Sequence, residues 1–351
     1  MNPPIPRHIH YLAMATALST LFLVCIGGMV TSKGVGMSVP DWPNSYGYNM
    51  FLLPWDKWNQ GGVFWEHSHR LKGAFVGLLT MSLAISLWFS RVPELLRKLG
   101  LVAFFGVVLQ GVLGGFRVVF DKHGWGAEFG VIHAAVAQLF FSLVCVIALM
   151  ASRRWQSWGS GAAESSGNSS LRLWAPALTV LIFLQLIIGA AMRHQHAGLA
   201  IPDFPLAYGR VWPDTSPEAI AGYNQARVSM MSYNDITAGQ VVLQMVHRIT
   251  AYSIAALVFL CWWKTRKTHQ PGSPLRRFSN TWLGLILVQV TLGAATIWTG
   301  KAADVATAHM AVGALSLMTG VLFSAAAFRL LPESPSPSLS RSSADMAGRT
   351  A

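Results

Sequence analysis

The sequence predicts an all-α integral membrane protein whose eight transmembrane helices form two tandem four-helix bundles related by pseudo-two-fold symmetry. Three observations support this prediction. Of the 351 residues, 53% are hydrophobic and only 11% are charged, which leaves too little polar surface to cover a soluble core. Eight apolar runs are long enough to cross a bilayer. The second half of the chain also repeats the motifs of the first half in the same order.

The predicted membrane helices follow the apolar runs, since roughly 20 residues cross the hydrocarbon core of a bilayer. The runs cover residues 11–30, 69–90, 97–117, 128–150, 173–192, 241–263, 279–298 and 305–328. The first run follows Arg7 and has the outline of a signal peptide, but it is long for one and no small-x-small cleavage site follows it. We therefore expect it to be the first membrane helix, which the repeat also requires.

The basic residues predict the orientation of the helices. Short connections on one side carry the excess of positive charge, namely Arg91, Arg97, Lys98, Arg153, Arg154, Lys264, Arg266, Lys267, Arg276 and Arg277. Connections on the other side are longer and mix both signs of charge. The positive-inside rule therefore puts both termini in the cytoplasm and the long loops outside a bacterial inner membrane. The net charge of +12 serves orientation in this interpretation and needs no nucleic-acid partner.

The internal repeat is clearest where the first and fifth predicted helices run into the loops that follow them. Residues 27–47 read GGMVTSKGVGMSVPDWPNSYG and residues 189–209 read GAAMRHQHAGLAIPDFPLAYG, with seven identities in a gap-free alignment. EHSHR at 66–70 then matches QMVHR at 244–248. The motif Gln-x-x-Leu-Gly recurs at 110–114 and 289–293, and a helix with a lone histidine near its start follows each copy.

The repeat also predicts the division of the chain. Residues 1–155 form an N-terminal four-helix unit, 156–172 a Ser/Gly-rich inner linker and 173–331 a C-terminal four-helix unit. Because each unit has an even number of helices, both copies have the same orientation, related by an axis along the membrane normal. Residues 332–351 are polar and rich in Pro and Ser, which is typical of a disordered tail.

Four histidines lie at equivalent depth in the even-numbered helices: His69, His133, His247 and His309. A single histidine of this kind is often a satisfied core residue, but a paired repeat in two bundles favours a functional role. Two histidines on facing helices are a natural axial pair for haem iron, and the neighbouring small residues leave room for a porphyrin. Zinc would require a third or fourth ligand, and copper lacks a supporting Met or Cys motif, although copper stays a weaker alternative.

The residues beside these histidines suggest further roles. Arg70 and Arg248 directly follow a histidine, near a predicted helix start where a cation opposes the macrodipole, so haem propionates or an interfacial position would explain them. Glu66 lies three residues before His69 and thus on nearly the same helix face, whereas Gln244 occupies the equivalent position in the second half. Because only the acid can hold or release a proton, we expect Glu66 to mark the reacting half; capping of the helix is the alternative.

The remaining candidates are weaker. His67 lies about 200° round the helix from His69. His123, His194 and His196 occupy the long connections without repeat partners, which is typical of exposed polar residues. The three cysteines at positions 25, 145 and 261 all lie inside apolar runs, so we expect small buried hydrophobes and no disulfide or redox site.

On the PDWP and PDFP loops, the Glu66-x-x-His69-Arg70 motif and the other three histidines, the sequence resembles the haem A synthase family over about residues 11–330. The family oxidises the C8 methyl group of haem O to the formyl group of haem A for cytochrome oxidase. The resemblance implies a substrate haem between His69 and His133, with Glu66 as catalytic residue. It also implies a haem b between His247 and His309.

The resemblance implies partners as well: a haem O synthase, which is a farnesyltransferase, and a ferredoxin-like electron donor, with a homo-oligomer among the possible states. Some bacterial members carry cysteine pairs in their outer loops; this chain has none there, so a redox role for such pairs does not transfer. Two other classes stay open from the residues alone. A di-haem b-type electron-transfer cytochrome would use the same histidines without explaining Glu66, and a transporter would need mid-membrane charges, which the helices lack.

Overall fold

The computed structural model describes residues 5–158, 170–228 and 235–332, and eight long helices make up most of these residues. The long helices are α1 (Arg7–Ser32), α3 (Gly61–Phe89), α4 (Glu94–Asp121), α5 (Gly126–Met150), α7 (Leu171–His194), α9 (Ala238–Thr268), α10 (Pro274–Trp298) and α11 (Ala303–Leu330). All eight are long and apolar enough to cross a membrane, which confirms the eight predicted spans. Most of the predicted linker and nearly all of the predicted tail lie outside the described residues.

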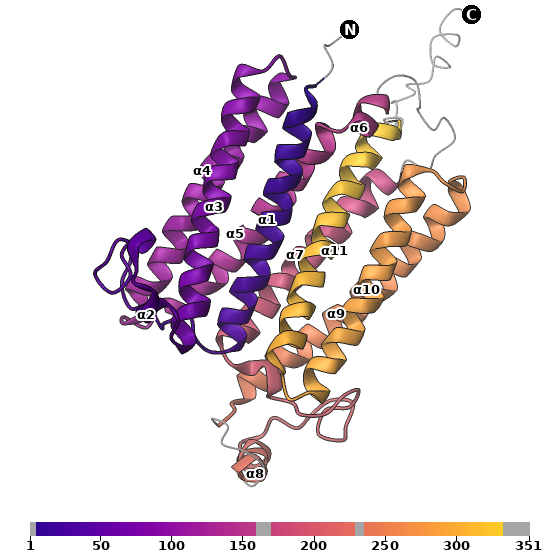
Figure 1. Ribbon diagram of the computed structural model, residues 1–351. Coiled ribbons are helices and arrows are strands. Elements are labelled where there is room, and N and C mark those ends of the chain that lie inside the picture. The colour runs from indigo at the N-terminus through magenta and orange to yellow at the C-terminus, as the bar shows by residue number, and fades with distance from the viewer. Residues whose placement is uncertain (1–4, 159–169, 229–234, 333–351) are drawn as a thin grey trace, which may run out of the picture.

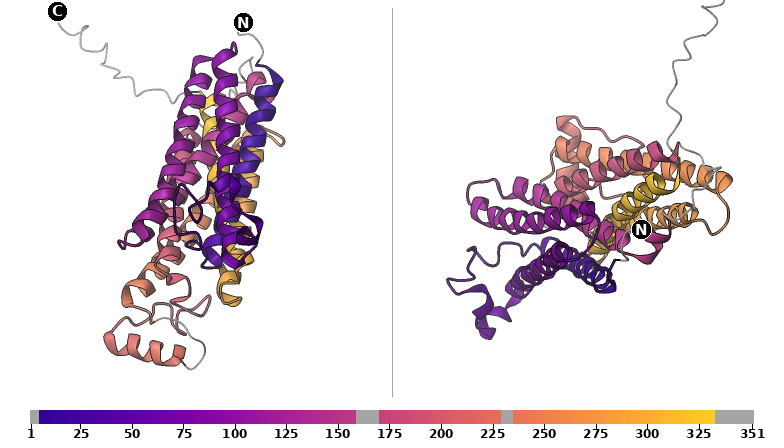
Figure 2. Two further views of the ribbon diagram at one scale, coloured as in Figure 1. Left: turned by 60° about the vertical axis from the view of Figure 1, so that its left-hand side comes forward. Right: turned by 90° about the horizontal axis from the view of Figure 1, so that it is seen from above.

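The helices pack as two bundles (Figure 1). In the first bundle, α1, α3, α4 and α5 surround one apolar core, and in the second α7, α9, α10 and α11 surround another. The view along the helix axes in Figure 2 shows the two groups side by side. This arrangement confirms the predicted tandem of four-helix bundles.

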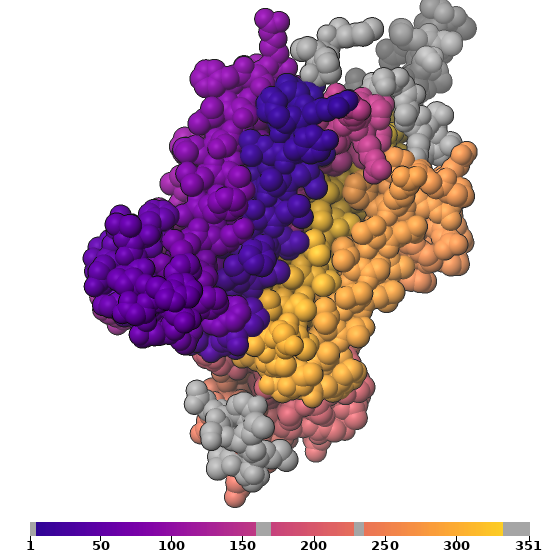
Figure 3. Space-filling view, viewed as in Figure 1, coloured from indigo at the N-terminus to yellow at the C-terminus, as the bar shows by residue number. Residues whose placement is uncertain are grey.

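The two bundles meet along α1 with α11, α5 with α7, and α5 with α11. Figure 3 shows α1 in indigo lying against α11 in yellow. Exchanging α1 with α7 and α5 with α11 maps this set of contacts onto itself. The contacts are thus compatible with the predicted pseudo-two-fold axis along the helices.

Short elements lie at both ends of the bundles. The long connections hold α2 (Trp55–Trp58), α8 (Pro217–Val228) and two 3₁₀ turns, η1 (Met50–Leu52) and η2 (Ala197–Leu199). These connections lie at one end, which we call the loop end, and α6 (Arg153–Ser157) lies at the opposite end together with the start of α1 and the end of α11 (Figure 1).

The helix starts differ from the sequence-based expectation in one respect that matters for the site. The helix predicted to begin at His69 begins at Gly61, because polar residues such as Glu66 and Ser68 interrupt the apolar run without breaking the helix. Across the four helices concerned, each histidine lies six to nine residues inside its helix. Arg70 is therefore not in a first turn, and the macrodipole neither opposes it nor explains Glu66 as a cap of α3.

The cysteines are free thiols in α1, α5 and α9, as expected. Cys25 and Cys145 are half-buried and Cys261 is buried, so each fills apolar space in or beside a bundle core.

Candidate functional site

The two proline-containing loops fold in the same way in both halves. In each loop an aspartate carboxylate accepts hydrogen bonds from the backbone N–H groups of a tyrosine and a glycine, both with positive φ. These bonds join Asp41 to Tyr46 and Gly47 at 2.7 Å each, and Asp203 to Tyr208 and Gly209 at 2.7 and 2.9 Å. The tyrosine hydroxyls donate back to the carbonyls of Ser38 and Ala200. The sequence repeat is therefore also a structural repeat.

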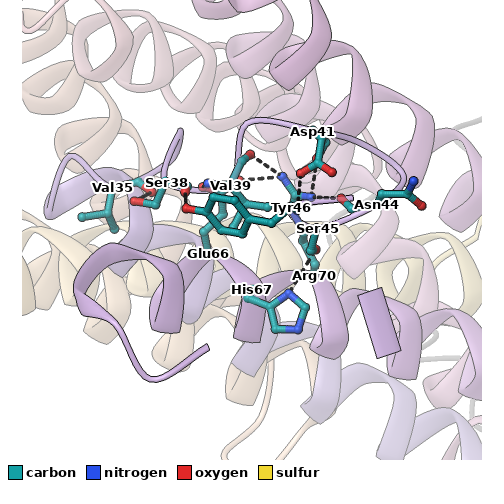
Figure 4. Close-up of polar contacts among 10 residues, drawn as sticks. All are labelled: Val35, Ser38, Val39, Asp41, Asn44, Ser45, Tyr46, Glu66, His67 and Arg70. Carbon is teal, nitrogen blue, oxygen red and sulfur yellow. Dashed lines mark hydrogen bonds and ion pairs between the residues drawn. The ribbon is translucent and has the colours of Figure 1, made fainter. Parts of the chain in front are cut away.

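Glu66 and Gln244 each anchor the loop of their own half. Oε2 of Glu66 accepts a hydrogen bond from the Val39 N–H at 2.9 Å (Figure 4). In the second half, Oε1 of Gln244 accepts one from the Ile201 N–H at 2.6 Å. Both side chains are buried, at 4% and 2% exposed. The difference is that Glu66 also forms an ion pair with Arg70, at 2.8 Å, whereas Gln244 donates to loop carbonyls. Both side chains therefore anchor a loop, and at this position the halves differ only in the negative charge of Glu66.

Arg70 and Arg248 also bind these two loops, through the backbone carbonyls of loop residues. Arg70 donates to the carbonyls of Asp41 at 2.6 Å and Asn44 at 2.9 Å (Figure 4). Arg248 donates to the equivalent carbonyls of Asp203 at 2.8 Å and Leu206 at 2.9 Å. Both guanidinium groups thus have partners in the protein, and the expected contact with haem propionates stays a prediction.

His67 is part of this loop anchor. Its ring is buried, at 1% exposed, and Nδ1 lies 3.2 Å from the hydroxyl of Ser45. The ring also packs edge-on against Trp58, with 5.4 Å between ring centroids. His67 therefore faces the loop, in keeping with its expected position away from the face of His69.

Each of the four repeated histidines lies against a glycine on the neighbouring helix. A Cβ atom added at that glycine would lie close to Cε1 of the imidazole. The distances are 2.9 Å for Gly27 and His69, 3.4 Å for Gly114 and His133, 3.3 Å for Gly189 and His247, and 3.1 Å for Gly293 and His309. The distances at Gly27, Gly189 and Gly293 are shorter than ordinary van der Waals contact. The glycines that end the odd-numbered predicted helices thus make room for the imidazole rings themselves.

The second pair shows how its rings are oriented. The centroids of His247 and His309 are 6.4 Å apart. Nδ1 of His309 lies 3.1 Å from the backbone carbonyl of Gln289, to which an Nδ1–H donates. Gln185 binds the backbone carbonyl of His247 at 2.8 Å and approaches its Nδ1 at 3.1 Å. In His309 the Nδ1–H tautomer leaves Nε2 with the lone pair that a metal ligand needs.

In the first pair, α4 carries the glycine that His133 lies against and also donates a hydrogen bond to His133. Gln110, the repeat partner of Gln289, donates to the backbone carbonyl of His133 at 3.2 Å. The Nδ1 atoms of His69 and His133 make no side-chain hydrogen bond with the described residues. Each ring nevertheless lies near a backbone carbonyl of the preceding long helix, that of Leu23 for His69 and that of Gln110 for His133.

A groove with a volume of about 540 Å³ opens on the surface of the first bundle, and its lining includes residues next to His69 in the chain but not His69 itself. Its walls come from α1, α2 and α3 and are mostly aromatic or aliphatic, with Phe22, Ile26 and Trp65 among them. Ile26 and Ser68, which both line it, are the chain neighbours of Gly27 and His69. The first bundle therefore has an apolar groove at the level of His69 on the surface that would face lipid.

Sequence reasoning missed two arginines at the loop end. Arg117 of α4 lies within electrostatic range of His69 and His133, and Arg193 of α7 lies within range of His309. Both stand near the end of an apolar run, and the repeat alignment puts threonine at the equivalent positions 296 and 31. An arginine in one half with a threonine at the equivalent position of the other was the signal from which these two residues could have been predicted. His194, expected to be an exposed loop residue, ends α7 half-buried, and its ring packs against Gly130 of α5.

The donor set fits a haem better than a bare metal ion. Within the described ranges, no group of three or more His, Cys, Asp or Glu side chains converges as a metal site would require. Two imidazoles that bind one metal atom from opposite sides at about 2.0–2.1 Å have ring centroids separated by roughly 6 Å, which agrees with the second pair. The fold and site thus define a polytopic membrane protein with one pair of neighbouring histidines in each of two bundles.

Comparison with known proteins gives the family. The COX15-CtaA model, described as cytochrome oxidase assembly protein, matches residues 10–321, and the chain belongs to this family. It is 28% identical to the heme A synthase of Methylobacterium sp. (strain 4-46), over 84% of this chain and 89% of that protein. It is 26% identical to the heme A synthase of Geobacillus kaustophilus, over 90% of each, and 28% identical to that of Nitrosospira multiformis, over 86% and 88%.

Proposed function

We propose that this protein is a haem A synthase, an enzyme that oxidises the C8 methyl group of haem O to a formyl group in the membrane. The observation that carries the proposal is the repeated histidine pair at the loop end, in a chain that matches the family over residues 10–321. The histidines occur in both halves, but the acid Glu66 is replaced by the amide Gln244 in the second half. This difference favours a reacting site in the first half and a permanent cofactor site in the second.

In this proposal His69 and His133 bind the substrate haem in the first bundle, and His247 and His309 bind a haem b in the second. The Nδ1 bond of His309 and the 6.4 Å ring separation support the second assignment. The groove at the level of His69 supports the first, since a hydrophobic substituent of the porphyrin has an apolar surface to occupy there. When bound, haem b supplies one-electron redox chemistry.

In the ring-oxidation route the methyl group and one water give the formyl group, four protons and four electrons. Two of the protons leave the methyl group, two leave the water that supplies the oxygen atom, and the four electrons pass to an acceptor outside the protein. Positive charge then develops at the methyl carbon, and a fixed carboxylate close by lowers the energy of that charge in a site of low dielectric. Glu66 is the candidate. Its carboxylate is held by Arg70 and by the Val39 N–H, so it needs little reorganisation during the reaction.

The test of this function is the identity of the haems in the purified protein. We expect haem b together with haem O, haem A or a hydroxylated intermediate after co-expression with a haem O synthase. Haem b alone, in protein purified from cells that contain haem O, would identify a di-haem electron-transfer cytochrome and contradict the proposal.

We also propose that haem O reaches the first site from a haem O synthase, that a ferredoxin-like protein supplies the electron path, and that the chain acts in a bacterial inner membrane, where it can form homo-oligomers. The first of these partners makes a lipid-embedded product, haem O, which suits the apolar groove on the first bundle. Co-purification with a tagged haem O synthase, and size by light scattering, test the first and last of these statements.

Reporter fusions test the proposed orientation. Fusions at Ser157 and after Leu331 should report the cytoplasm and one near Asp214 the opposite side, because Arg153 and Arg154 stand in a short connection and Asp214 in a long one. Paired alkaline phosphatase and green fluorescent protein fusions measure this. A phosphatase signal at Ser157 would contradict both the orientation and the tandem arrangement.

A further inference from the structure

Four basic side chains gather at the loop end where the two bundles meet. Arg117 comes from α4, Arg193 and His194 from the end of α7, and Lys301 from the turn between α10 and α11. All four are half-buried. Arg193 lies within electrostatic range of Arg117, His194 and Lys301, and Arg117 within range of His194. Among the described residues, no carboxylate lies within ion-pair distance of either arginine, although Glu66 and Asp121 lie within electrostatic range of Arg117.

Arg117 belongs to the first site. His69 and His133 both lie within its electrostatic range, and a Cβ atom at Gly36 would lie 2.8 Å from its Nη2, so the guanidinium reaches the loop after α1. It donates no hydrogen bond to another described residue, in contrast to Arg70, whose two terminal nitrogens bind loop carbonyls and Glu66. Of the two arginines near His69 and His133, Arg117 is therefore the one whose N–H donors have no hydrogen-bond partner among the described residues.

Arg193 belongs to the second site but reaches into the first bundle. Its Nη2 binds the carbonyl of Gly28 at 2.5 Å and the hydroxyl of Ser32, both in α1. Its Nη1 has only the sulfur of Met310 as a partner, at 3.1 Å, and a thioether is a weak acceptor. Met310 follows His309 in the chain, and Arg193 lies within electrostatic range of His309, so Nη1 lies near the second pair with a partner that a stronger acceptor can replace.

Such a cluster is suited to binding an anion. Half-buried cations that repel one another are costly unless negative charge is close, and burial together with the charge of Arg193 lowers the pKa of Lys301. Guanidinium groups bind carboxylates through charge-assisted, often bidentate hydrogen bonds. A porphyrin held by either histidine pair brings two carboxylates with it. Thr296 is the repeat equivalent of Arg117, and Thr31 is that of Arg193. The two arginines are therefore not copies of each other, and each bundle contributes one from a different helix of its repeat.

We propose that Arg117 and Arg193 form a carboxylate clamp at the boundary between the bundles, in which Arg117 binds propionates of the haem held by His69 and His133, and Arg193 binds those of the haem held by His247 and His309. The clamp rests on the proposed haem sites. It assigns the propionate contacts to residues with available donors, and it brings the carboxylate edges of both haems to the same boundary.

The test is a double-mutant cycle between the protein and the haem carboxylates. The apo form of the full chain is reconstituted with iron protoporphyrin or with its dimethyl ester, for the wild type, Arg193→Gln and Arg193→Lys. We expect Arg193→Gln to weaken binding of the free acid at least about tenfold and to leave binding of the ester unchanged, with partial rescue by lysine. Arg117→Gln should do the same for the first site, measured in a His247→Ala background so that only that site binds. Arg210→Gln, at an exposed position of the long loop, is the charge-matched control.

A second measurement is the midpoint potential of bound haem b. Because a nearby cation favours the reduced form, Arg193→Gln should lower the potential by up to about 59 mV, which is a tenfold change in the one-electron ratio. Equal affinity of the wild type for the free acid and the ester would overturn the clamp even if the arginine variants do not fold. Loss of co-purified anionic lipid from these variants, with unchanged haem binding and potential, would assign the cluster to a lipid phosphate instead. Neither result depends on whether haem A is formed, so the clamp and the enzyme activity can fail separately.

Discussion

Replacing His247 or His309 with alanine is expected to remove haem b from the second bundle, to below about 10% occupancy, and to stop haem A formation. Each variant deletes one of the two axial ligands and leaves the other without its partner across the site. A cofactor that binds only the folded form stabilises it by about 2.7 kcal/mol at a hundredfold excess over its Kd. The thermal unfolding midpoint should therefore fall together with the haem b spectrum.

The same substitution in the first bundle should give a different result. His69→Ala and His133→Ala should keep the haem b spectrum while haem A formation stops or stalls at a hydroxylated product, because the substrate haem is no longer held beside Glu66. Reduced-minus-oxidised spectra and chromatography of extracted haems distinguish the two outcomes. His123→Ala, at an exposed position of the connection between α4 and α5, is the control and should behave as the wild type. If His69→Ala loses haem b while His247→Ala keeps it and turns over normally, the assignment of the two bundles is reversed.

Glu66→Gln is expected to lower haem A production at least ~10-fold, equivalent to ~1.4 kcal/mol of activation free energy, while both haem sites still fill. The substitution is well matched to this chain, because the second half already has an amide at this position. Gln244 holds the Ile201 N–H at 2.6 Å, so a glutamine at 66 can hold the Val39 N–H. Arg70 keeps its bonds to the carbonyls of the loop. The change therefore removes the charge and leaves the loop anchored.

The reciprocal variant is the control for Glu66→Gln. Gln244→Glu adds a carboxylate beside Arg248 in the second half, and activity should stay within about twofold of the wild type, since no oxidation occurs there. Haem content, measured for both variants, reports whether the loops still close over their sites. Full activity of Glu66→Gln would leave the ion pair with Arg70 and the bond to Val39 as the whole role of this glutamate.

The sequence by itself determined the membrane helices and the repeat. Apolar runs of bilayer length need no partner to be recognised, because the requirement comes from the hydrocarbon around them. All eight runs became helices, and the three cysteines lie in them as expected. The order of motifs also predicted which residues are equivalent in the two halves, such as Asp41 and Asp203. These two aspartates make the same hydrogen bond in their own loops, since equivalent segments of a repeat fold alike.

Only the tertiary structure decided which polar side chains have partners already. Arg70 and Arg248 stand beside the histidines in sequence, yet their donors bind loop carbonyls, while Arg117 and Arg193, from other helices, keep donors near the two pairs. Glu66 likewise proved to be a loop anchor in addition to any role in the reaction. Hydrogen-bond partners are chosen by distances of about 3 Å between groups that can be far apart in the chain. Hydropathy and motif spacing carry no information about such distances, whereas the packing of α1, α7 and α11 around Arg193 sets them directly.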